Sequence, residues 1–447
     1  MAKQAGKRVA VIGGGWAGCT AAVELSRHGH QVTLFESART LGGRARRVAV
    51  KEKVLDNGQH ILLGAYSETL RLMRIVGIDI DQSLLTLPLQ MRYPPNSGGM
   101  DFIAPRLPAP LHVLVALWRS KGLATEDKMA LARFSTTARW MGWTLNVDCS
   151  VAELLARFDQ TARIIQLMWR PLCIAALNTP PERASAQVFL NVLRDSLGAK
   201  RSASDMLVPR VDLSALYPQA CADFIEQRGG KLRYGASVKK IVGDGTGWQL
   251  DINGGDSMSS LERFDALVVA TQAEHAAVLL EGHTSVEHLA NLHYEPITTC
   301  YLQYGSDIRL DQPFFALLDD AGNNEFGQFV FDRGQLDASQ AGLLAVVVSA
   351  STDAVGLDQQ ALVKAVAAQL AKVLRVPALL TPQWSKVISE KRATFSCTPG
   401  LTRPTNDVGL PNLFIAGDYV AGDYPATLES AVRSGLGAAK AILANSY

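Results

Sequence analysis

The hydrophobic positions at the start of the chain follow the order strand, turn, helix, strand. Apolar residues fill Val9–Ile12 within an expected strand over residues 8–12. A helix-forming stretch covers 17–27, and a second apolar strand covers 31–35. This order predicts the βαβ opening of a nucleotide-binding sheet.

Similar patterns return much later in the chain. Residues 237–252 alternate apolar and polar side chains around a glycine-rich turn, which predicts a β-hairpin. Residues 264–271 and 413–416 are short apolar runs that predict two further buried strands. One amphipathic helix is expected after the last strand, with Leu428, Val432, Leu436, Ala439 and Leu443 on its apolar face.

Two insertions separate these blocks, a helix-rich one over 84–209 and a strand-rich one over 286–402. We therefore expect an α/β fold with a discontinuous, Rossmann-like nucleotide-binding domain. It should consist of residues 1–83, 210–285 and 403–447. The second, α+β domain should consist of residues 84–209 and 286–402. Insertions of this kind normally build the wall that selects a ligand.

Composition narrows the class of protein. The 447 residues carry a net charge of +2 and are 48% hydrophobic, so a large core is possible and nucleic acid is not an expected partner. The six cysteines are widely spaced, which favours reduced thiols in the cytoplasm over disulfides or a metal site. No signal peptide and no apolar run of about 18 residues is visible, so we expect a soluble protein or one bound to the inner face of the cytoplasmic membrane.

The glycine spacing after the first strand predicts a dinucleotide site. Gly13 permits the tight turn, Gly15 lets the backbone approach a pyrophosphate, and Gly18 lets helix and strand pack closely. The N-terminus of the helix favours the phosphate charge. Glu36, at the end of the second strand, suits ribose hydroxyls and would repel a 2′-phosphate, so FAD or NAD fits better than NADP. The alternative is a chance glycine turn.

Two further motifs could complete this site. In the Leu41–Arg46 stretch, Arg44 could bring its guanidinium onto the pyrophosphate, while the other basic residues nearby suit a solvated surface. Near the far end, Gly417 lets the backbone pass a cofactor and Asp418 can accept from a ribityl hydroxyl. Thr427 is a good residue to begin the helix that follows. Taken alone, the Gly417–Asp418 pair would be an ordinary turn.

Together these motifs resemble the amine-oxidase and phytoene-desaturase group of FAD enzymes, and the likeness covers nearly the whole chain. The resemblance implies that Val238 lends backbone contacts to adenine, and that the strand ending at Ala270 borders the cofactor. Ser430 departs from the group, many members of which have glycine there. The FAD contacts that we expect are Gly13, Gly15, Trp16, Ala17, Gly18, Glu36, Gly43, Arg44, Gly58, Val238, Ala270, Gly417, Asp418, Thr427 and Leu428.

Three stretches resemble one subfamily more closely, the hydroxysqualene dehydroxylases of bacterial hopanoid synthesis. They are Leu55–Gly64, Trp169–Pro180 and Pro425–Ala431. This resemblance implies reductive removal of an allylic hydroxyl from a C30 isoprenoid, which gives squalene. The substrate would then be long and almost wholly apolar.

A general acid is needed at the leaving oxygen of such a substrate. His60 is our candidate, because the resemblance places its stretch beside the flavin; a structural histidine bonded to backbone is the alternative. Asp205 is a weaker candidate, for which a surface turn is the alternative. Trp169 could shelter a cation with its ring, unless it is a core aromatic.

An apolar helix over 111–118 could bring the protein to a membrane. Arg106 precedes it, and Arg119 and Lys121 follow it, which is typical of an interfacial helix with basic anchors. We therefore predict peripheral membrane contact through residues 105–121. An ordinary buried helix would have the same pattern.

Two rival functions are compatible with these motifs. A carotenoid-type desaturase would use the same flavin site in the oxidising direction. A non-enzymatic lipid escort of this fold would bind no flavin. Only one dinucleotide motif is visible, since Gly243–Gly247 has no helix after it, so the sequence identifies no electron donor.

Overall fold

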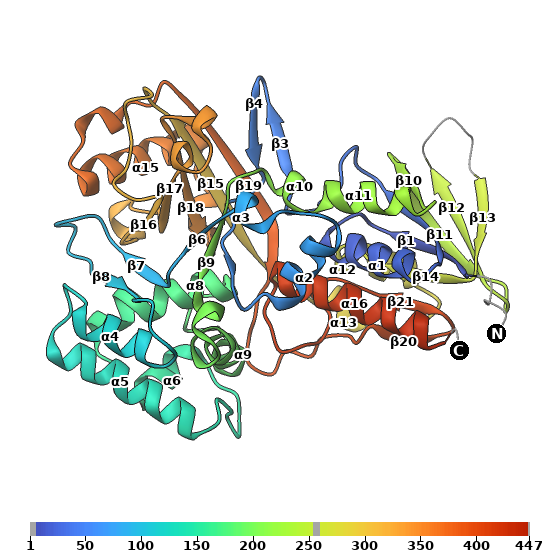
Figure 1. Cartoon of the computed structure of the whole chain (residues 1–447), viewed down its shortest axis with the longest axis horizontal. Coiled ribbons are helices and arrows are strands. Elements are labelled where there is room, and N and C mark those ends of the chain that lie inside the picture. Colours follow the sequence, from blue (N-terminus) through green and yellow to red (C-terminus); the bar gives the residue numbers. More distant parts are fainter. Residues whose placement is uncertain (1–5, 254–259, 446–447) are drawn as a thin grey trace.

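The computed structural model of the chain describes residues 6–253 and 260–445. The molecule has two lobes, and both ends of the chain lie at the outer end of one of them (Figure 1). This lobe contains a six-stranded sheet and is called the nucleotide-binding lobe below. The other is called the substrate lobe, and the helical insertion and a five-stranded sheet form it.

The six-stranded sheet is assembled from distant parts of the chain, as predicted. Its strands are parallel except β20, and β1 pairs with both β2 and β14. The apolar runs that predicted these strands are buried at its centre. In spatial order the strands are β10 (Lys231–Tyr234), β2 (Gln31–Glu36), β1 (Arg8–Ile12), β14 (Ala266–Val269), β21 (Leu413–Ile415) and β20 (Asp407–Leu410).

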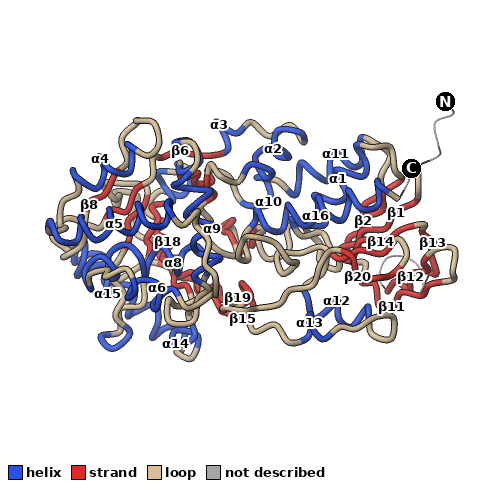
Figure 2. Tube along the Cα trace, turned by 90° about the horizontal axis from the view of Figure 1, so that it is seen from below, coloured by secondary structure: helices blue, strands red, loops and turns tan. Residues whose placement is uncertain are grey.

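Helices α1 (Trp16–Arg27), α11 (Pro218–Gln227) and α16 (Leu428–Ala444) lie on one side of this sheet (Figure 2). Helix α16 packs closely on α1, since a side chain at Gly435 would overlap the carbonyl oxygen of Ala17. The predicted hairpin is present, but it belongs to a separate sheet on the other side, beside α12. These elements are β11 (Ser237–Gly243), β12 (Trp248–Asn253), β13 (Ser260–Phe264), α12 (Ala273–Leu280) and α13 (Glu287–Ala290).

The insertion over 84–209 is mainly helical, as predicted. Phe134 and Trp169 lie in its core with their ring centroids 4.5 Å apart. Its main helices are α4 (Leu111–Arg119), α5 (Thr125–Trp140), α6 (Val151–Arg157), α7 (Ala162–Ile164), α8 (Arg170–Leu177) and α9 (Ala186–Leu193), with π-helical turns over Ile165–Trp169 and Arg194–Gly198.

The insertion over 286–402 is rich in strands, as predicted, and they form an antiparallel sheet. Helix α15 (Gln359–Leu374) covers its outer face, and its inner face joins the core shared with the helical insertion. In spatial order the strands are β16 (Phe314–Ala316), β17 (Phe329–Asp332), β18 (Leu343–Ser349), β15 (Tyr294–Gln303) and β19 (Trp384–Phe395); α14 (Thr352–Val355) follows β18 along the chain.

Short elements join the two lobes. Strand β9 pairs with both β5 and β6, so one small sheet spans the expected domain boundaries near residues 84 and 210. The hairpin of β3 and β4 projects from the molecule (Figure 1). The elements of this region are β3 (Arg47–Val50), β4 (Lys53–Asp56), β5 (Leu62–Leu63), α2 (Ser67–Ile75), α3 (Ile80–Ser83), β6 (Leu84–Leu87), β9 (Met206–Pro209) and α10 (Leu213–Leu216). The hairpin of β7 (Gln90–Arg92) and β8 (Asp101–Ile103) belongs to the substrate lobe, where it contacts β16 and α4.

All six cysteines are buried. Among the helices of residues 6–253 and 260–445, none combines the length and the apolar character that a membrane span requires.

Candidate flavin and substrate site

The glycine loop between β1 and α1 has the geometry that a dinucleotide requires. Gly13 has φ +105°, and a side chain there would come within 2.5 Å of the Ala270 carbonyl oxygen. A side chain at Gly18 would overlap the carbonyl oxygen of Gly13, so α1 begins directly against the strand. Gly15 faces open space, because its nearest neighbour in that direction is the Gly43 Cα, 4.0 Å away. The backbone therefore leaves a corridor between two glycine turns.

Glu36 lies at one end of this corridor. Its carboxylate accepts hydrogen bonds from the Gly14 and Ala38 N–H groups, both at 2.7 Å. A carboxylate has about four acceptor positions, so capacity for ribose hydroxyls remains. The Ala236 N–H donates to the Glu36 carbonyl oxygen at 3.0 Å, which brings the start of β11 beside the end of β2. The contact of Val238 with adenine stays a prediction.

Arg44 connects the two ends of the chain. Its Nη2 donates to Asp418 Oδ1 at 2.6 Å, and its Nη1 donates to the Ala393 carbonyl oxygen at 2.6 Å. Two positions before Arg44, the backbone of Gly42 pairs with that of Gly15 in an isolated parallel β-bridge. The N-terminal glycine loop and the C-terminal carboxylate therefore adjoin the same turn. The expected contact of Arg44 with the pyrophosphate stays a prediction.

The C-terminal part of the site is a turn followed by α16. Thr427 caps this helix by accepting from the Ser430 N–H at 3.1 Å, and the Ser430 hydroxyl donates to the Asp418 carbonyl oxygen at 3.2 Å. Ser430, which departs from the glycine that the resemblance leads us to expect, thus ties the helix to the Asp418 turn. Leu428 is the first residue of α16.

Tyr419 belongs to this region, although the sequence did not single it out. Its ring lies against Gly417, where a side chain would overlap it. Its hydroxyl is buried and has no hydrogen-bond partner in the part of the chain that the structure describes. The open Gly15 corridor and this unpaired hydroxyl beside Arg44 and Asp418 both suit an extended polar ligand. The residues present therefore fit FAD.

The stretch that carries Gly58 and His60 faces the five-stranded sheet. His60 Nδ1 lies 2.9 Å from the Gly58 carbonyl oxygen. Because a carbonyl only accepts, Nδ1 carries a proton, and Nε2 is the acceptor of the neutral ring. Burial, together with the charge of Arg44, lowers the pKa of His60 below the ordinary 6.5. His60 therefore makes the backbone hydrogen bond expected of a structural histidine, and its Nε2 remains the acceptor of the ring.

A buried polar network holds this stretch in place. The Tyr301 hydroxyl donates to the Asp56 carbonyl oxygen at 2.8 Å and accepts from Gln59 Nε2 at 2.9 Å. Arg333 donates to Gln59 Oε1 at 3.0 Å and lies 4.0 Å from the Asp56 carboxylate. Burial raises the pKa of Asp56 to about 6. The sequence did not single out Arg333, which is distant in the chain and 4% exposed.

Two expectations about catalytic side chains need correction. Asp205 is 7% exposed, so it is not the surface carboxylate that was the alternative. Both its oxygens accept from Arg201, at 2.8 and 3.1 Å, which leaves it poorly placed to donate a proton. Trp169 is buried, donates to Gln160 Oε1 at 2.8 Å and packs on Phe134. It is therefore a core aromatic and is not available to shelter a cation.

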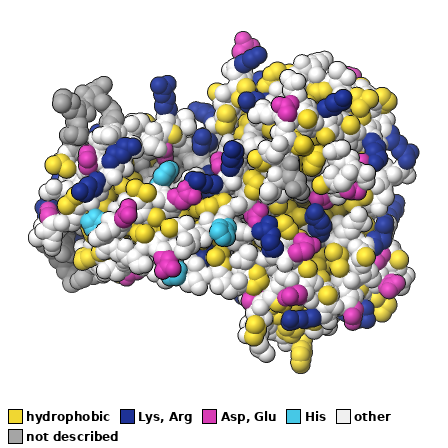
Figure 3. Space-filling model, turned by 180° about the vertical axis from the view of Figure 1, so that it is seen from behind, with side chains coloured by type: hydrophobic (Ala, Val, Ile, Leu, Met, Phe, Trp, Pro, Cys, Tyr) yellow, Lys and Arg dark blue, Asp and Glu magenta, His cyan; other side chains and the backbone are white. Residues whose placement is uncertain are grey.

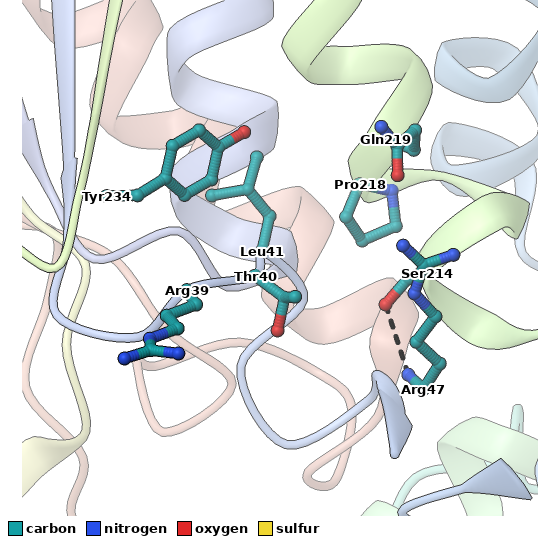
Figure 4. A pocket seen from close by; sticks show the side chains of 8 residues that line it. All are labelled: Arg39, Thr40, Leu41, Arg47, Ser214, Pro218, Gln219 and Tyr234. Carbon is teal, nitrogen blue, oxygen red and sulfur yellow. Dashed lines mark hydrogen bonds between the residues drawn. The ribbon is translucent and has the colours of Figure 1, made fainter. Parts of the chain in front are cut away.

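Two cavities border these elements. A cavity of about 130 Å³ lies beside the turn after β2, lined by Arg39, Leu41, Arg47 and Tyr234 among others (Figure 4). It is too small for a dinucleotide or an isoprenoid. A cavity of about 580 Å³ lies between α8 and β18 in the substrate lobe, and its lining mixes apolar residues such as Ile174, Leu318 and Phe326 with charged ones such as Arg170 and Asp319. That volume is within the usual range for ligand sites.

The fold and this arrangement define a flavin-dependent oxidoreductase. Residues 16–443 match the flavin containing amine oxidoreductase family, and the chain belongs to that family. It is an enzyme and its cofactor is FAD, which sets aside the non-enzymatic escort. No cluster of metal-ligating side chains occurs within residues 6–253 and 260–445.

Known proteins resemble the chain along its whole length. Hydroxysqualene dehydroxylase of Rhodopseudomonas palustris is 27% identical, over 98% of this chain and 99% of that protein. Zeta-carotene desaturase of Synechocystis sp. is 26% identical, over 98% and 97%. Among solved structures, an oxidoreductase from Methanosarcina mazei has a TM-score of 0.75 at 15% identity, covering 96% of this chain and 99% of that one. Cyclohexylamine oxidase from Brevibacterium oxydans has a TM-score of 0.69 at 17% identity, covering 98% and 99%.

Proposed function

We propose that this enzyme removes the hydroxyl group of hydroxysqualene reductively and releases squalene. The observation that carries the proposal is the full-length similarity to proteins named hydroxysqualene dehydroxylase, at 25–27% identity. In the reaction the C–O bond breaks, the oxygen takes up a proton and leaves as water, and the carbon receives hydride. Bound reduced FAD supplies that hydride.

The substrate lobe supports an apolar substrate. The inner face of its sheet joins the helical insertion in one continuous apolar core. An apolar wall of this kind excludes water from a developing allylic cation, which would otherwise be trapped as the alcohol.

His60 remains our candidate for the proton donor. In this role it must carry a second proton, on Nε2, and its lowered pKa makes that form scarce at neutral pH. If His60 protonates the leaving oxygen, kcat should fall as the pH rises through a midpoint below 6.5. His60→Gln keeps a polar side chain that does not titrate, so it should abolish this step in the profile. Unchanged turnover of His60→Ala with intact flavin would remove His60 from the mechanism.

The decisive experiment is anaerobic incubation of the reduced enzyme with hydroxysqualene. Oxidation of the flavin, followed by its absorbance, should accompany the formation of squalene, identified by mass. The alternative is a carotenoid desaturase, which the similarity to zeta-carotene desaturase keeps open. Formation of a polyene from a more saturated chain, with no squalene from hydroxysqualene, would favour that alternative.

We also propose that the helical insertion binds the surface of a membrane, from which so apolar a substrate must come. Helix α4 has an exposed apolar face, with Leu111 51%, Leu114 43% and Trp118 75% exposed, so it is not an ordinary buried helix. The neighbouring α5 exposes Met129 and Trp140, the latter by 87%. Hydrophobic side chains are visible on the outside of the lower right part of the molecule in Figure 3, where this insertion lies.

Vesicles containing anionic lipid test this surface. The double variant Trp118→Ser/Trp140→Ser should bind at least tenfold more weakly than wild type, because two interfacial indoles are worth about 2 kcal/mol together. Leu261→Ser is the matched control, since Leu261 is 70% exposed but lies on β13 in the other lobe. Equal binding of all three proteins in sedimentation at low salt would refute this membrane surface.

A further inference from the structure

Thr299 carries a hydroxyl for which the chain provides no partner. The residue is fully buried on β15, and its Oγ1 has no hydrogen bond within the described residues. Its neighbour Thr298 points to the opposite face of the sheet, where its hydroxyl lies 3.1 Å from Ser351 Oγ and 2.9 Å from Ser389 Oγ. Two adjacent threonines on one strand therefore differ completely in how their hydroxyls are satisfied.

The sheet around Thr299 is apolar. Strand pairing places Phe329, Val347, Thr299 and Ile388 side by side in one row across the inner face. Thr299 is the one polar residue of this row. A buried hydroxyl without a partner costs free energy, and Val would fill nearly the same volume without that cost. The hydroxyl therefore requires an explanation outside the packing of the sheet.

The hydroxyl faces the Gly58–His60 stretch. A Cβ built on Gly58 would lie 3.9 Å from Thr299 Oγ1 and 3.9 Å from His60 Cε1. Apart from the chain neighbours of Gly58, no other described heavy atom lies within 4 Å of that point. Gly58 therefore leaves room for about one methyl group, and the threonine hydroxyl and the imidazole are the nearest side chains to that space. Tyr301, two residues further on the same face, holds this stretch over the sheet.

We propose that Thr299 and His60 form the subsite that binds the hydroxyl group of the isoprenoid substrate. Thr299 donates its O–H to the substrate oxygen. That oxygen has two lone pairs and one proton, so His60 Nε2 can accept from it when neutral or donate to it when protonated. The apolar chain of the substrate lies along the row of Phe329, Val347 and Ile388. This inference rests on the proposed function, because it assumes a hydroxylated isoprenoid.

Binding of two ligands to the FAD-loaded enzyme tests the subsite. Hydroxysqualene and squalene differ in one hydroxyl group, and perturbation of the flavin spectrum reports the binding of each in the same detergent. Thr299→Val should weaken hydroxysqualene about tenfold, as expected for one lost hydrogen bond, and leave squalene within twofold. Thr299→Ser should restore the difference in affinity between hydroxysqualene and squalene. Thr298→Val is the matched control and should not alter the ratio of the two dissociation constants.

Several results would overturn the subsite. If Thr299→Val weakens both ligands equally, the residue only shapes the wall. If the ratio is unchanged while the reduction potential of the flavin shifts, the hydroxyl acts on the cofactor. Wild-type enzyme that binds the two ligands equally and forms no squalene refutes the proposed function together with the subsite. Wild-type enzyme that forms squalene, with Thr299→Val retaining the ligand preference, refutes the subsite alone.

Discussion

The two lobes treat their polar groups differently. In the nucleotide-binding lobe the charged groups that shape the site are paired within the chain, as in Glu36 with the Gly14 N–H and Arg44 with Asp418. In the substrate lobe, the Thr299 hydroxyl and both ring nitrogens of His112 are buried without a partner among the described residues.

This difference indicates how each site is prepared for its ligand. Glycine turns and paired charges give the flavin site its shape before any ligand binds. The substrate lobe keeps unpaired donors in an apolar core, which lowers stability and is typical of a site that awaits a partner. Tyr419 is the counterpart in the nucleotide-binding lobe, and its unpaired hydroxyl lies beside Arg44 and Asp418, where FAD would pass.

The largest effect is expected from the backbone of the flavin site. Gly18→Ala would push α1 away from the Gly13 turn, because the added methyl overlaps the Gly13 carbonyl oxygen. We expect protein without bound flavin, a loss of affinity of at least 100-fold, measured by flavin absorbance after purification. Gly29→Ala is the control: Gly29 has φ +85° but open space around it, so it should cost about 1 kcal/mol and keep the flavin. Normal flavin content in Gly18→Ala would show that the close contact between Gly18 and the Gly13 turn does not determine flavin binding.

Arg44→Ala should have the next largest effect. It leaves the Asp418 carboxylate, which is 8% exposed, without its cation. We expect a loss of about 2–3 kcal/mol in unfolding free energy, less than for a fully buried pair because the Arg44 side chain is 25% exposed. FAD should bind at least tenfold more weakly by titration of the apoprotein. The stability and the FAD affinity of Arg44→Lys should lie between those of wild type and Arg44→Ala. Undiminished FAD affinity in Arg44→Ala would contradict a role of the Arg44–Asp418 pair in binding.

Asp56 should make stability depend on pH. Its pKa is raised from 3.8 to about 6 in the folded protein, so folding favours the protonated carboxyl. The protein should therefore be most stabilised by this group below pH 4 and lose about 3 kcal/mol as the pH rises to about 6. Asp56→Asn keeps an acceptor for the Leu213 N–H but does not titrate. If the denaturation midpoints of wild type and Asp56→Asn change with pH in the same way between pH 4 and 7, Asp56 does not cause this effect.

The smallest expected effect is a difference in stability between substitutions at Thr298 and at Thr299. Thr298→Val removes hydrogen bonds to Ser351 and Ser389 and should cost about 1–2 kcal/mol. Thr299→Val removes an unpaired hydroxyl and should stabilise by up to about 1 kcal/mol. Urea denaturation of the apoproteins measures both. Destabilisation of the same size in both variants would mean that Thr299 has a partner in the folded chain.

Local patterns were sufficient to predict the nucleotide-binding lobe. The apolar runs at 8–12, 31–35 and 413–416 coincide with strands of one sheet, because buried parallel strands are continuous in hydrophobicity. The place of the hairpin was not predicted, since alternation in sequence does not tell which sheet a strand joins. Strand β10 at the edge of the main sheet was missed, because its residues 231–234 are half polar.

The substrate site was less accessible to prediction. Neighbouring residues of a strand point to opposite faces of its sheet, which separates Thr298 from Thr299. Only the folded sheet shows which face meets His60. Arg333 comes 277 positions after Asp56 (333 − 56), and its proximity is a property of tertiary structure alone. The pairing of Asp205 with Arg201 is local, at i and i+4, yet the sequence does not reveal that Asp205 is buried.

The strand order of the main sheet has a consequence for biosynthesis. Strand β1 leaves the ribosome some 400 residues before β21 and α16, which complete the same sheet and cover it. A nascent chain stalled before residue 413 has an open sheet edge and lacks Asp418. FAD should therefore be captured only after residues 413–444 have been synthesised, and until then a chaperone would have to shield the exposed strands.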